Sequence, residues 1–127
     1  MKEMLVRDIM QIGVPACEAD SSLTDVARLL SEEARDVLVV MGEKGVMGVV
    51  SQSDLVRAFL SGHHSMTAQD IMTSDVYSVA PDIPLKTAIQ KMLDKGVHQV
   101  LVVRDNGGTP APTGVLSKRH LVELMAE

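Results

Sequence analysis

Aromatic side chains are almost absent from this sequence. Phe59 and Tyr77 are the whole set, at 2% of the chain, and there is no tryptophan. Proteins that bind single-stranded nucleic acid commonly stack bases on aromatic rings, so the composition argues against that class. The core has to be built from Val, Leu, Ile and Ala and from nine methionines, which fill irregular gaps between other side chains.

Cysteine is scarcer still, because Cys17 is the single one. One cysteine excludes an internal disulfide and a cysteine metal cluster. We expect Cys17 to be a small buried hydrophobic residue in a strand. His63 and His64 are adjacent, so they cannot face one metal ion together from a regular helix. We expect both to be exposed to solvent, and the sequence predicts no metal site.

Positive charge is in deficit, with twelve Lys and Arg against seventeen Asp and Glu and a net charge of -5. A protein that binds nucleic-acid backbones needs a basic face, so no nucleic-acid partner is expected. A small anionic ligand needs only a local cationic pocket. No hydrophobic run approaches the length that spans a bilayer, and the N-terminal MKEMLVRDIM is too charged for a signal peptide. We therefore expect no membrane partner and a cytoplasmic location.

Signatures of catalysis are also missing. The sequence has no P-loop, no Gly-x-Ser-x-Gly turn, no His-Glu-x-x-His pair and no paired cysteines. What it has is a length of 127 residues with 46% hydrophobic residues, which is enough to bury a compact core. We therefore expect a globular domain that carries none of these catalytic motifs.

The chain repeats itself after about sixty residues. Three short stretches recur in the same order: DIM at 8–10 and 70–72, VLVV at 37–40 and 100–103, and GVVS at 48–51 with GVLS at 114–117. The separation grows from 62 to 66 residues, which indicates small insertions in the second copy. The largest insertion falls in RDNGGTPAPTG, where glycine and proline predict an exposed loop.

The two copies predict the same secondary structure. Apolar residues at i, i+3, i+4 and i+7 predict a helix that begins near Leu23 and another that begins near Leu85. Ser and Asp precede the first helix as caps, and Pro84 suits the first turn of the second. DVLVVM and GVMGVV, separated by the turn GEKG, predict a hairpin.

Each copy also has a short strand at its start, near Val14 or Val76, and a helix at its end. The expected apolar faces of these final helices are Leu55, Val56 and Phe59 in the first copy and Leu121, Val122 and Met125 in the second. The fold class is therefore α/β (α+β), with two β-α-β-β-α repeats over residues 1–61 and 70–127 and a linker at 62–69. About sixty residues bury little surface alone, so we expect the repeats to pack as one pseudo-two-fold domain.

With this order of elements, the sequence resembles a tandem pair of CBS domains, a family named for cystathionine beta-synthase. The matching segments are VRDIM and AQDIM, SLTDVARLL and PLKTAIQKML, VLVV twice, and GVVSQSDL with GVLSKRHL. The resemblance covers essentially the whole chain and implies a stand-alone pair, or Bateman module. Such a module is regulatory, forms a flat homodimer, and binds AMP, ADP, ATP or a related adenosyl ligand without converting it. It requires no cofactor, and an effector protein reads the signal.

The family's nucleotide pattern is Gly, an apolar residue, any residue, Ser or Thr, two residues of any kind, and Asp. The first copy satisfies it from Gly48 through Val49 and Ser51 to Asp54. Gly48 lets the backbone approach the ligand, and Ser51 supplies a hydroxyl at a helix N-terminus, which favours anions. Asp54 is an acceptor suited to both hydroxyls of a ribose.

The second copy departs from this pattern at one position. Gly114, Val115 and Ser117 are present, but His120 replaces the aspartate. A neutral imidazole cannot bind a diol as a carboxylate does, so we expect one good site. The second, weaker site would comprise Ser117, His120, Val115, Val14 and Asp36. His120 faces phosphate there, or its site is empty and it is solvated on its helix.

The resemblance implies that Asp54 faces the other repeat. The residues expected there are Val76, Tyr77, Val97, His98 and Gln99. Their backbone groups would bind the adenine edge between apolar walls. The phosphates would point to the axis between the copies, where His98, Arg35 and Arg119 are the cationic candidates. Arginine matches the geometry of phosphate, and a protonated histidine adds charge.

Plainer interpretations remain beside these. Asp54 can be a helix cap only, because Ser and Asp favour the first turn of a helix. His98 can be a surface loop residue, and Lys118 and Arg119 an ordinary solvated face. The alternative function is a purely structural dimerisation module with a vestigial nucleotide pocket. The replacement of the motif aspartate by His120 in the second copy favours this alternative, and the intact pattern in the first copy opposes it.

Overall fold

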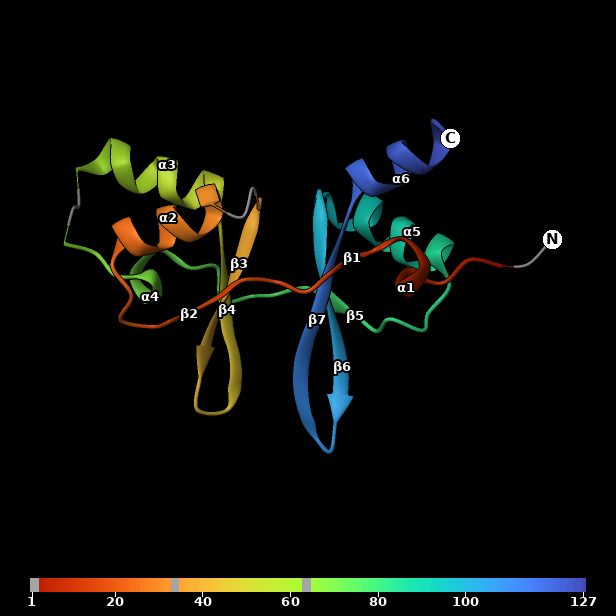
Figure 1. The fold of residues 1–127 in the computed structure, drawn as a ribbon, viewed down its shortest axis with the longest axis horizontal. Coiled ribbons are helices and arrows are strands. Elements are labelled where there is room, and N and C mark those ends of the chain that lie inside the picture. Colours follow the sequence, from red (N-terminus) through yellow and green to blue (C-terminus); the bar gives the residue numbers. More distant parts are fainter. Residues whose placement is uncertain (1–2, 33–34, 63–64) are drawn as a thin grey trace. The chain divides into compact units, whose positions relative to one another are not determined.

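The structure is a computed structural model that describes residues 3–32, 35–62 and 65–127 (Figure 1). It divides into two compact units, and we refer to Val14–Val76 as the first-motif unit and to Met1–Gly13 with Tyr77–Glu127 as the second-motif unit. Each unit contains a β-sheet and helices, so the predicted mixed α/β fold is confirmed. His63 and His64, predicted to be exposed in a linker, lie outside the described residues.

The first-motif unit contains a three-stranded sheet. Its elements are β2 (Ala16–Glu18), α2 (Leu23–Glu32), β3 (Val37–Gly42), β4 (Gly45–Ser51), α3 (Gln52–Ser61) and α4 (Ala68–Ile71). The strand order is β2-β3-β4, with β2 parallel and β4 antiparallel to β3. Helices α2 and α3 lie side by side (Figure 1). The predicted strand, helix, hairpin and helix are all present.

The second-motif unit contains a four-stranded sheet. Its elements are α1 (Val6–Ile9), β1 (Gln11–Ile12), β5 (Ser78–Val79), α5 (Leu85–Lys95), β6 (Gln99–Asn106), β7 (Thr109–Ser117) and α6 (Lys118–Met125). The order is β1-β7-β6-β5, with β5 parallel to β6 and the other pairs antiparallel. The sequence predicted a short strand near Val14 and another near Val76, and β2 and β5 begin two residues after these positions.

The cores are aliphatic, as the composition predicted. Fully buried core residues include Val26, Leu38, Val40 and Val50 in one unit, and Val6, Met92, Val102 and Leu116 in the other. Cys17 is confirmed as a buried residue in β2. Burial raises the pKa of its thiol, a hydrogen bond with Ser21 lowers it, and the charge of Glu18 raises it.

The residues that lead into the DIM triplet of each copy pack on the body of the other copy. The backbone N–H of Val6 donates to Ile83 O at 3.0 Å, and the N–H of Ala68 donates to Ser21 O at 2.9 Å. Val6 and Ala68 are both fully buried. The compact units are consequently divided after Gly13 and Val76, whereas the predicted boundaries follow the sequence repeat.

The segment RDNGGTPAPTG was predicted to be an exposed turn. Residues 104–110 are exposed, as predicted, but the irregular part is shorter than expected. Strands β6 and β7 continue through most of the segment and leave only Gly107 and Gly108 as the turn. Both glycines have positive φ, 65° and 90°, as a two-residue hairpin turn requires. Pro110 and Pro112 fit in β7 because β1 pairs only with Gly114 and Val115, so β7 is an edge strand beside the prolines.

The predicted apolar face of α3 does not pack into the core as a whole. Leu55 is partly buried against the core, but Val56 is 59% exposed and Phe59 74%. In α6, Val122 and Met125 are exposed in the same way. Among the described residues, no helix combines the length and the apolar character needed to cross a membrane.

Candidate functional site

Helix α3 begins where β4 ends, and Ser51 is its N-cap. The backbone N–H of Ser51 donates to Asp54 Oδ2 at 2.8 Å, and the Ser51 hydroxyl donates to the same oxygen at 3.0 Å. The Asp54 N–H donates back to Ser51 Oγ at 3.3 Å. This reciprocal arrangement is a capping box, which satisfies backbone donors at the helix start. The interpretation of Asp54 as a helix cap is therefore confirmed for one of its two carboxylate oxygens.

The second carboxylate oxygen of Asp54 makes an ion pair. Asp54 Oδ1 lies 2.5 Å from Arg57 Nη2, and the Asp54 side chain is only 6% exposed while that of Arg57 is 69% exposed. The sequence analysis missed Arg57. Its position three residues after Asp54 is the spacing at which opposite charges meet on a helix, so the signal was present in the sequence.

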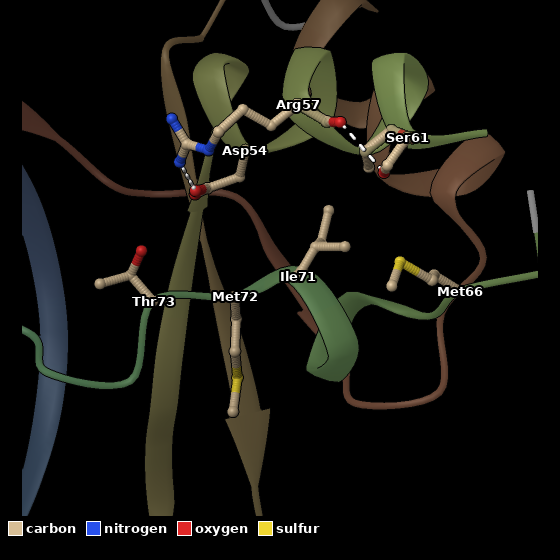
Figure 2. Close-up of a pocket in the computed structure, with 8 residues that line it drawn as sticks. Asp54, Arg57, Ser61, Met66, Ile71, Met72 and Thr73 are labelled. Carbon is tan, nitrogen blue, oxygen red and sulfur yellow. Dashed lines mark hydrogen bonds and ion pairs between the residues drawn. The ribbon is translucent and has the colours of Figure 1, made fainter. Parts of the chain in front are cut away.

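A hollow of about 360 Å³ lies beside this ion pair (Figure 2). Its lining residues come from α3 and from the segment that leads through α4: Asp54, Arg57, Ala58, Ser61, Met66, Ile71, Met72 and Thr73. Figure 2 shows the Asp54 carboxylate and the Thr73 side chain at one end of the hollow and Met66 at the other. The volume is in the range of small-molecule sites. The hollow therefore joins the first repeat's nucleotide motif to the start of the second repeat.

Gly48 does not have the role that the sequence predicted. A Cβ atom on Gly48 would lie 2.7 Å from Thr73 O and 2.8 Å from Met72 Sδ, so this space is filled by protein and is not open to a ligand. The absence of a side chain lets the Thr73 backbone pair with Val49: the Val49 N–H donates to Thr73 O at 3.0 Å, and the Thr73 N–H donates to Val49 O at 2.8 Å. Gly48 and Val49 therefore position Thr73 at the hollow.

The other predicted residues of this unit lie near the start of α3 or at the ends of the unit. The Gln52 side-chain amide donates to Arg35 O at 3.2 Å and to Asp36 Oδ1 at 3.4 Å. Because Gln52 is the first residue of α3, Arg35 and Asp36 lie close to the capping box. Val14 and Val76 are half-buried. None of these four predicted residues lines the hollow.

The remaining predicted site residues belong to the second-motif unit. Tyr77 O accepts from the Leu101 N–H at 3.3 Å, and His98 O accepts from the Lys118 N–H at 3.1 Å. Gln99 begins β6, and Val97 packs against the core of this unit. Arg119 makes an ion pair with Glu123 at 3.8 Å. That these residues join Asp54 around one ligand stays a prediction.

His120 takes the structural place of Asp54 in the second copy. The Ser117 N–H donates to His120 Nδ1 at 3.0 Å, so the imidazole caps α6. His120 is half-buried, which corrects the expectation that it is solvated on its helix. Val115 pairs with Gln11 in the sheet, and a Cβ on Gly114 would collide with the Gln11 backbone, as at Gly48.

Comparison with known proteins identifies the family. The CBS domain family model matches residues 6–61 and again residues 68–127, so the chain belongs to the CBS domain family. The predicted resemblance is thereby confirmed.

In the part of the chain that the structure describes, no group of three or more His, Cys, Asp or Glu side chains is placed to hold a metal ion.

Two curated relatives are longer than this chain. The chain is 33% identical over 101 residues to the arabinose 5-phosphate isomerase KpsF of Escherichia coli, a match that covers 76% of this chain and 31% of the isomerase. It is 26% identical over 111 residues to an uncharacterized protein of Methanopyrus kandleri, covering 84% of this chain and 57% of that protein. The chain thus spans less than two thirds of either relative.

Solved structures share the fold over nearly the whole chain. The CBS domain pair of protein MJ0100, crystallised with 5′-methylthioadenosine and S-adenosyl-L-methionine, has a TM-score of 0.87 and 21% identity, and the match covers 98% of both chains. An uncharacterized conserved protein from Pyrococcus horikoshii has a TM-score of 0.83 and 20% identity, covering 98% of this chain and 94% of that one. At these identities the likeness establishes the fold.

Proposed function

We propose that this chain is a regulatory module that binds an adenosine-containing nucleotide at the hollow beside Asp54 and does not convert it. The observation that carries the proposal is the Asp54 carboxylate, which is 6% exposed, lines a hollow, and uses only one oxygen for the helix cap. The other oxygen pairs with Arg57 and has room for a further donor. The ligands of the MJ0100 domain pair, both adenosine derivatives, support this choice of ligand class.

The lining of the hollow suits a nucleoside. Vicinal ribose hydroxyls are donors, and Asp54 accepts such hydrogen bonds with the strength of a charged partner. Ile71 and Met66 supply apolar walls against which an adenine ring can pack. We propose further that AMP, ADP or ATP is the ligand, and that the predicted residues of the other unit, His98 and Arg119 among them, contact its phosphates.

The proposed regulation rests on the fact that the residues lining the hollow come from both repeats. The hollow lies between α3 of the first repeat and the start of the second, so a bound ligand contacts both repeats. A ligand shifts a conformational equilibrium by its differential affinity for the two states. We propose that an effector protein reads this shift, and that the chain itself has no catalytic role.

The direct test is calorimetric titration with AMP, ADP, ATP, S-adenosylmethionine and 5′-methylthioadenosine. Replacing Asp54 by Ala removes the acceptor of the ribose hydroxyls, and hydrogen bonds to charged groups contribute about 1.5–3 kcal/mol each. We expect Asp54→Ala to weaken binding by about ten- to a hundredfold. Asp54→Asn keeps a capping oxygen while it removes the charge, and it should also weaken binding.

Asp25 provides the matched control. It lies in the first turn of α2, beside its own capping serine, Ser22, and pairs with Arg28 at i,i+3, but it does not line the hollow. Asp25→Ala should therefore leave the affinity unchanged. Binding to none of the five ligands at millimolar concentration, or an Asp54→Ala affinity equal to that of Asp25→Ala, would contradict the proposed function.

A second candidate function is a purely structural dimerisation module. The exposed apolar residues Val56, Phe59 and Leu60 on α3, with Val122 and Met125 on α6, favour association. Thermal shift separates the two functions, because a ligand that binds only the folded state raises the melting temperature. A melting temperature that none of the five ligands changes would favour the structural module. A homodimer is compatible with both functions, and we propose it in either case.

A further inference from the structure

The two carboxylate oxygens of Asp54 are held in different ways. Oδ2 accepts from the N–H and the hydroxyl of Ser51, both of which belong to the helix cap. Oδ1 pairs with Arg57 Nη2, and this is its only partner among the described residues. An ionised carboxylate has about four acceptor sites on its two oxygens, and the cap uses both sites of Oδ2. A ribose hydroxyl that leaves the cap intact therefore binds Oδ1, which has room for it beside Arg57 (Figure 2).

Arg57 is well suited to turn toward a ligand. Its side chain is 69% exposed, and ion pairs with an exposed partner contribute about 0–1 kcal/mol to stability. The Arg57 guanidinium is also the one cationic group among the residues that line the hollow, and Asp54 is the one anionic group. The other lining residues are neutral. The hollow therefore has balanced charges until a ligand arrives.

We propose that Arg57 is a specificity-determining residue, which lies beside the ribose-binding oxygen of Asp54 and selects the charge of the rest of the ligand. This inference rests on the proposed function. A guanidinium that lines a hollow of about 360 Å³ stays within the screening length of about 10 Å of every part of a bound nucleoside. It favours ligands with a phosphate or another anionic group, and it disfavours a sulfonium cation. A neutral nucleoside gains nothing from this charge.

Three probes with the same nucleoside test this inference: AMP, which is anionic, adenosine, which is neutral, and S-adenosylmethionine, which carries a sulfonium. For Arg57→Met we expect the preference for AMP over adenosine to fall by about tenfold. The affinity for S-adenosylmethionine should stay unchanged or rise. Arg57→Lys keeps the charge and should retain most of the preference, although its ammonium lacks the planar fork of arginine.

The control variant is Arg28→Met. Arg28 pairs with Asp25 at 3.3 Å across the same i,i+3 spacing, and it does not line the hollow. We expect the ratio of AMP to adenosine affinity to equal that of the unchanged chain. A second measurement is the salt dependence of this ratio. It should fall with ionic strength in the unchanged chain and fall less steeply in Arg57→Met, because the charge contribution of Arg57 is screened by salt.

The outcomes separate this inference from the proposed function. If Asp54→Ala weakens binding but Arg57→Met leaves the ratio of AMP to adenosine affinity within twofold of the Arg28→Met value, the inference about Arg57 is overturned and the nucleotide site stands. If the unchanged chain binds none of the three probes, both are overturned. A lower ratio that Arg57→Lys restores supports both.

Discussion

At the scale of single residues, Asp54 and His120 show what helix capping requires and what it does not. His120 caps α6 with one ring nitrogen, so an acidic residue is not needed to form this cap. Asp54 caps α3 with one oxygen and keeps a second oxygen at the hollow. Helix capping therefore accounts for only one of the two carboxylate oxygens of Asp54. The second oxygen is what distinguishes the first copy from the second.

This comparison predicts the effect of His120→Asp on stability. A carboxylate at position 120 can accept the Ser117 N–H that now donates to Nδ1. It also places a negative charge in the first turn of α6, where the helix dipole stabilises anions by about 0.3–1 kcal/mol. We expect the free energy of unfolding to rise by about 0.5–1 kcal/mol, as measured by urea denaturation without ligand.

His98→Asp is the control, because it makes the same change of side chain at an exposed position outside any helix. Its stability should remain within about 0.5 kcal/mol of that of the unchanged chain, as is usual for surface substitutions. An equal or lower stability for His120→Asp would show that the imidazole caps this helix at least as well as a carboxylate.

At the scale of secondary structure elements, the motif glycines allow two segments to approach closely. Gly48→Ala places a methyl group 2.7 Å from the Thr73 carbonyl oxygen, which is backbone and cannot rotate away. Overpacking of this kind costs about 1–3 kcal/mol. We expect Gly48→Ala to lower the free energy of unfolding by this amount, measured by chemical denaturation.

Gly42 in β3 offers a matched substitution in the same sheet. A Cβ on Gly42 would also lie 2.7 Å from other atoms, but these belong to the Met47 side chain, which can change its rotamer. Gly42→Ala should therefore cost less than Gly48→Ala. Equal losses for the two variants would mean that the close approach of Thr73 does not set the cost at Gly48.

The sequence predicted those elements that carry a periodic signal. Helices α2 and α5 have ten and eleven residues, so their apolar stripes recur over several turns. Helices α1 and α4 have four residues each and show no periodicity, and the prediction missed them. The turn around Gly107 was predicted to be longer than it is, because glycine and proline occur both in loops and in edge strands.

The residues of the candidate site also divide into those that a sequence pattern predicts and those that no pattern predicts. Ser51 and Asp54 were predicted because the motif sets their spacing and their chemistry. Met66 and Thr73 carry no such motif, and they line the hollow only because the second repeat's first segment folds back onto α3 and β4. That contact is tertiary, and no local pattern in the sequence specifies it.

At the scale of the whole molecule, neither repeat is complete without the other. Val6 belongs to the first repeat but lies in the core of the second-motif unit, and Ala68 packs in the core of the first-motif unit. A cut between positions 62 and 68 would therefore remove a buried residue from each unit. Because the segment around Ala68 packs in the first-motif unit, a hollow inside this one compact unit is lined by residues of both repeats.

The exposed apolar face of α3 predicts how copies of the chain associate. Val56, Phe59 and Leu60 are more than half exposed, and Phe59 also lines an apolar groove of about 400 Å³ between α2 and α3. Homodimers most often use the same surface patch on both subunits. Phe59→Glu places a charge in that patch, and burying an unpaired charge is costly. We expect light scattering after gel filtration to show a dimer for the unchanged chain and a monomer for Phe59→Glu.

Ile12→Glu tests whether this effect belongs to α3. Ile12 is 80% exposed in β1, so the substitution introduces the same charge at another exposed apolar position. The Ile12→Glu chain should remain a dimer. Dissociation by both variants would place the interface elsewhere or indicate a general effect of charge, and a dimer that survives Phe59→Glu would show that the α3 face does not hold the copies together. Because a monomer that still binds nucleotide keeps its hollow intact, titration of Phe59→Glu also decides whether dimerisation and ligand binding are separate properties of the chain.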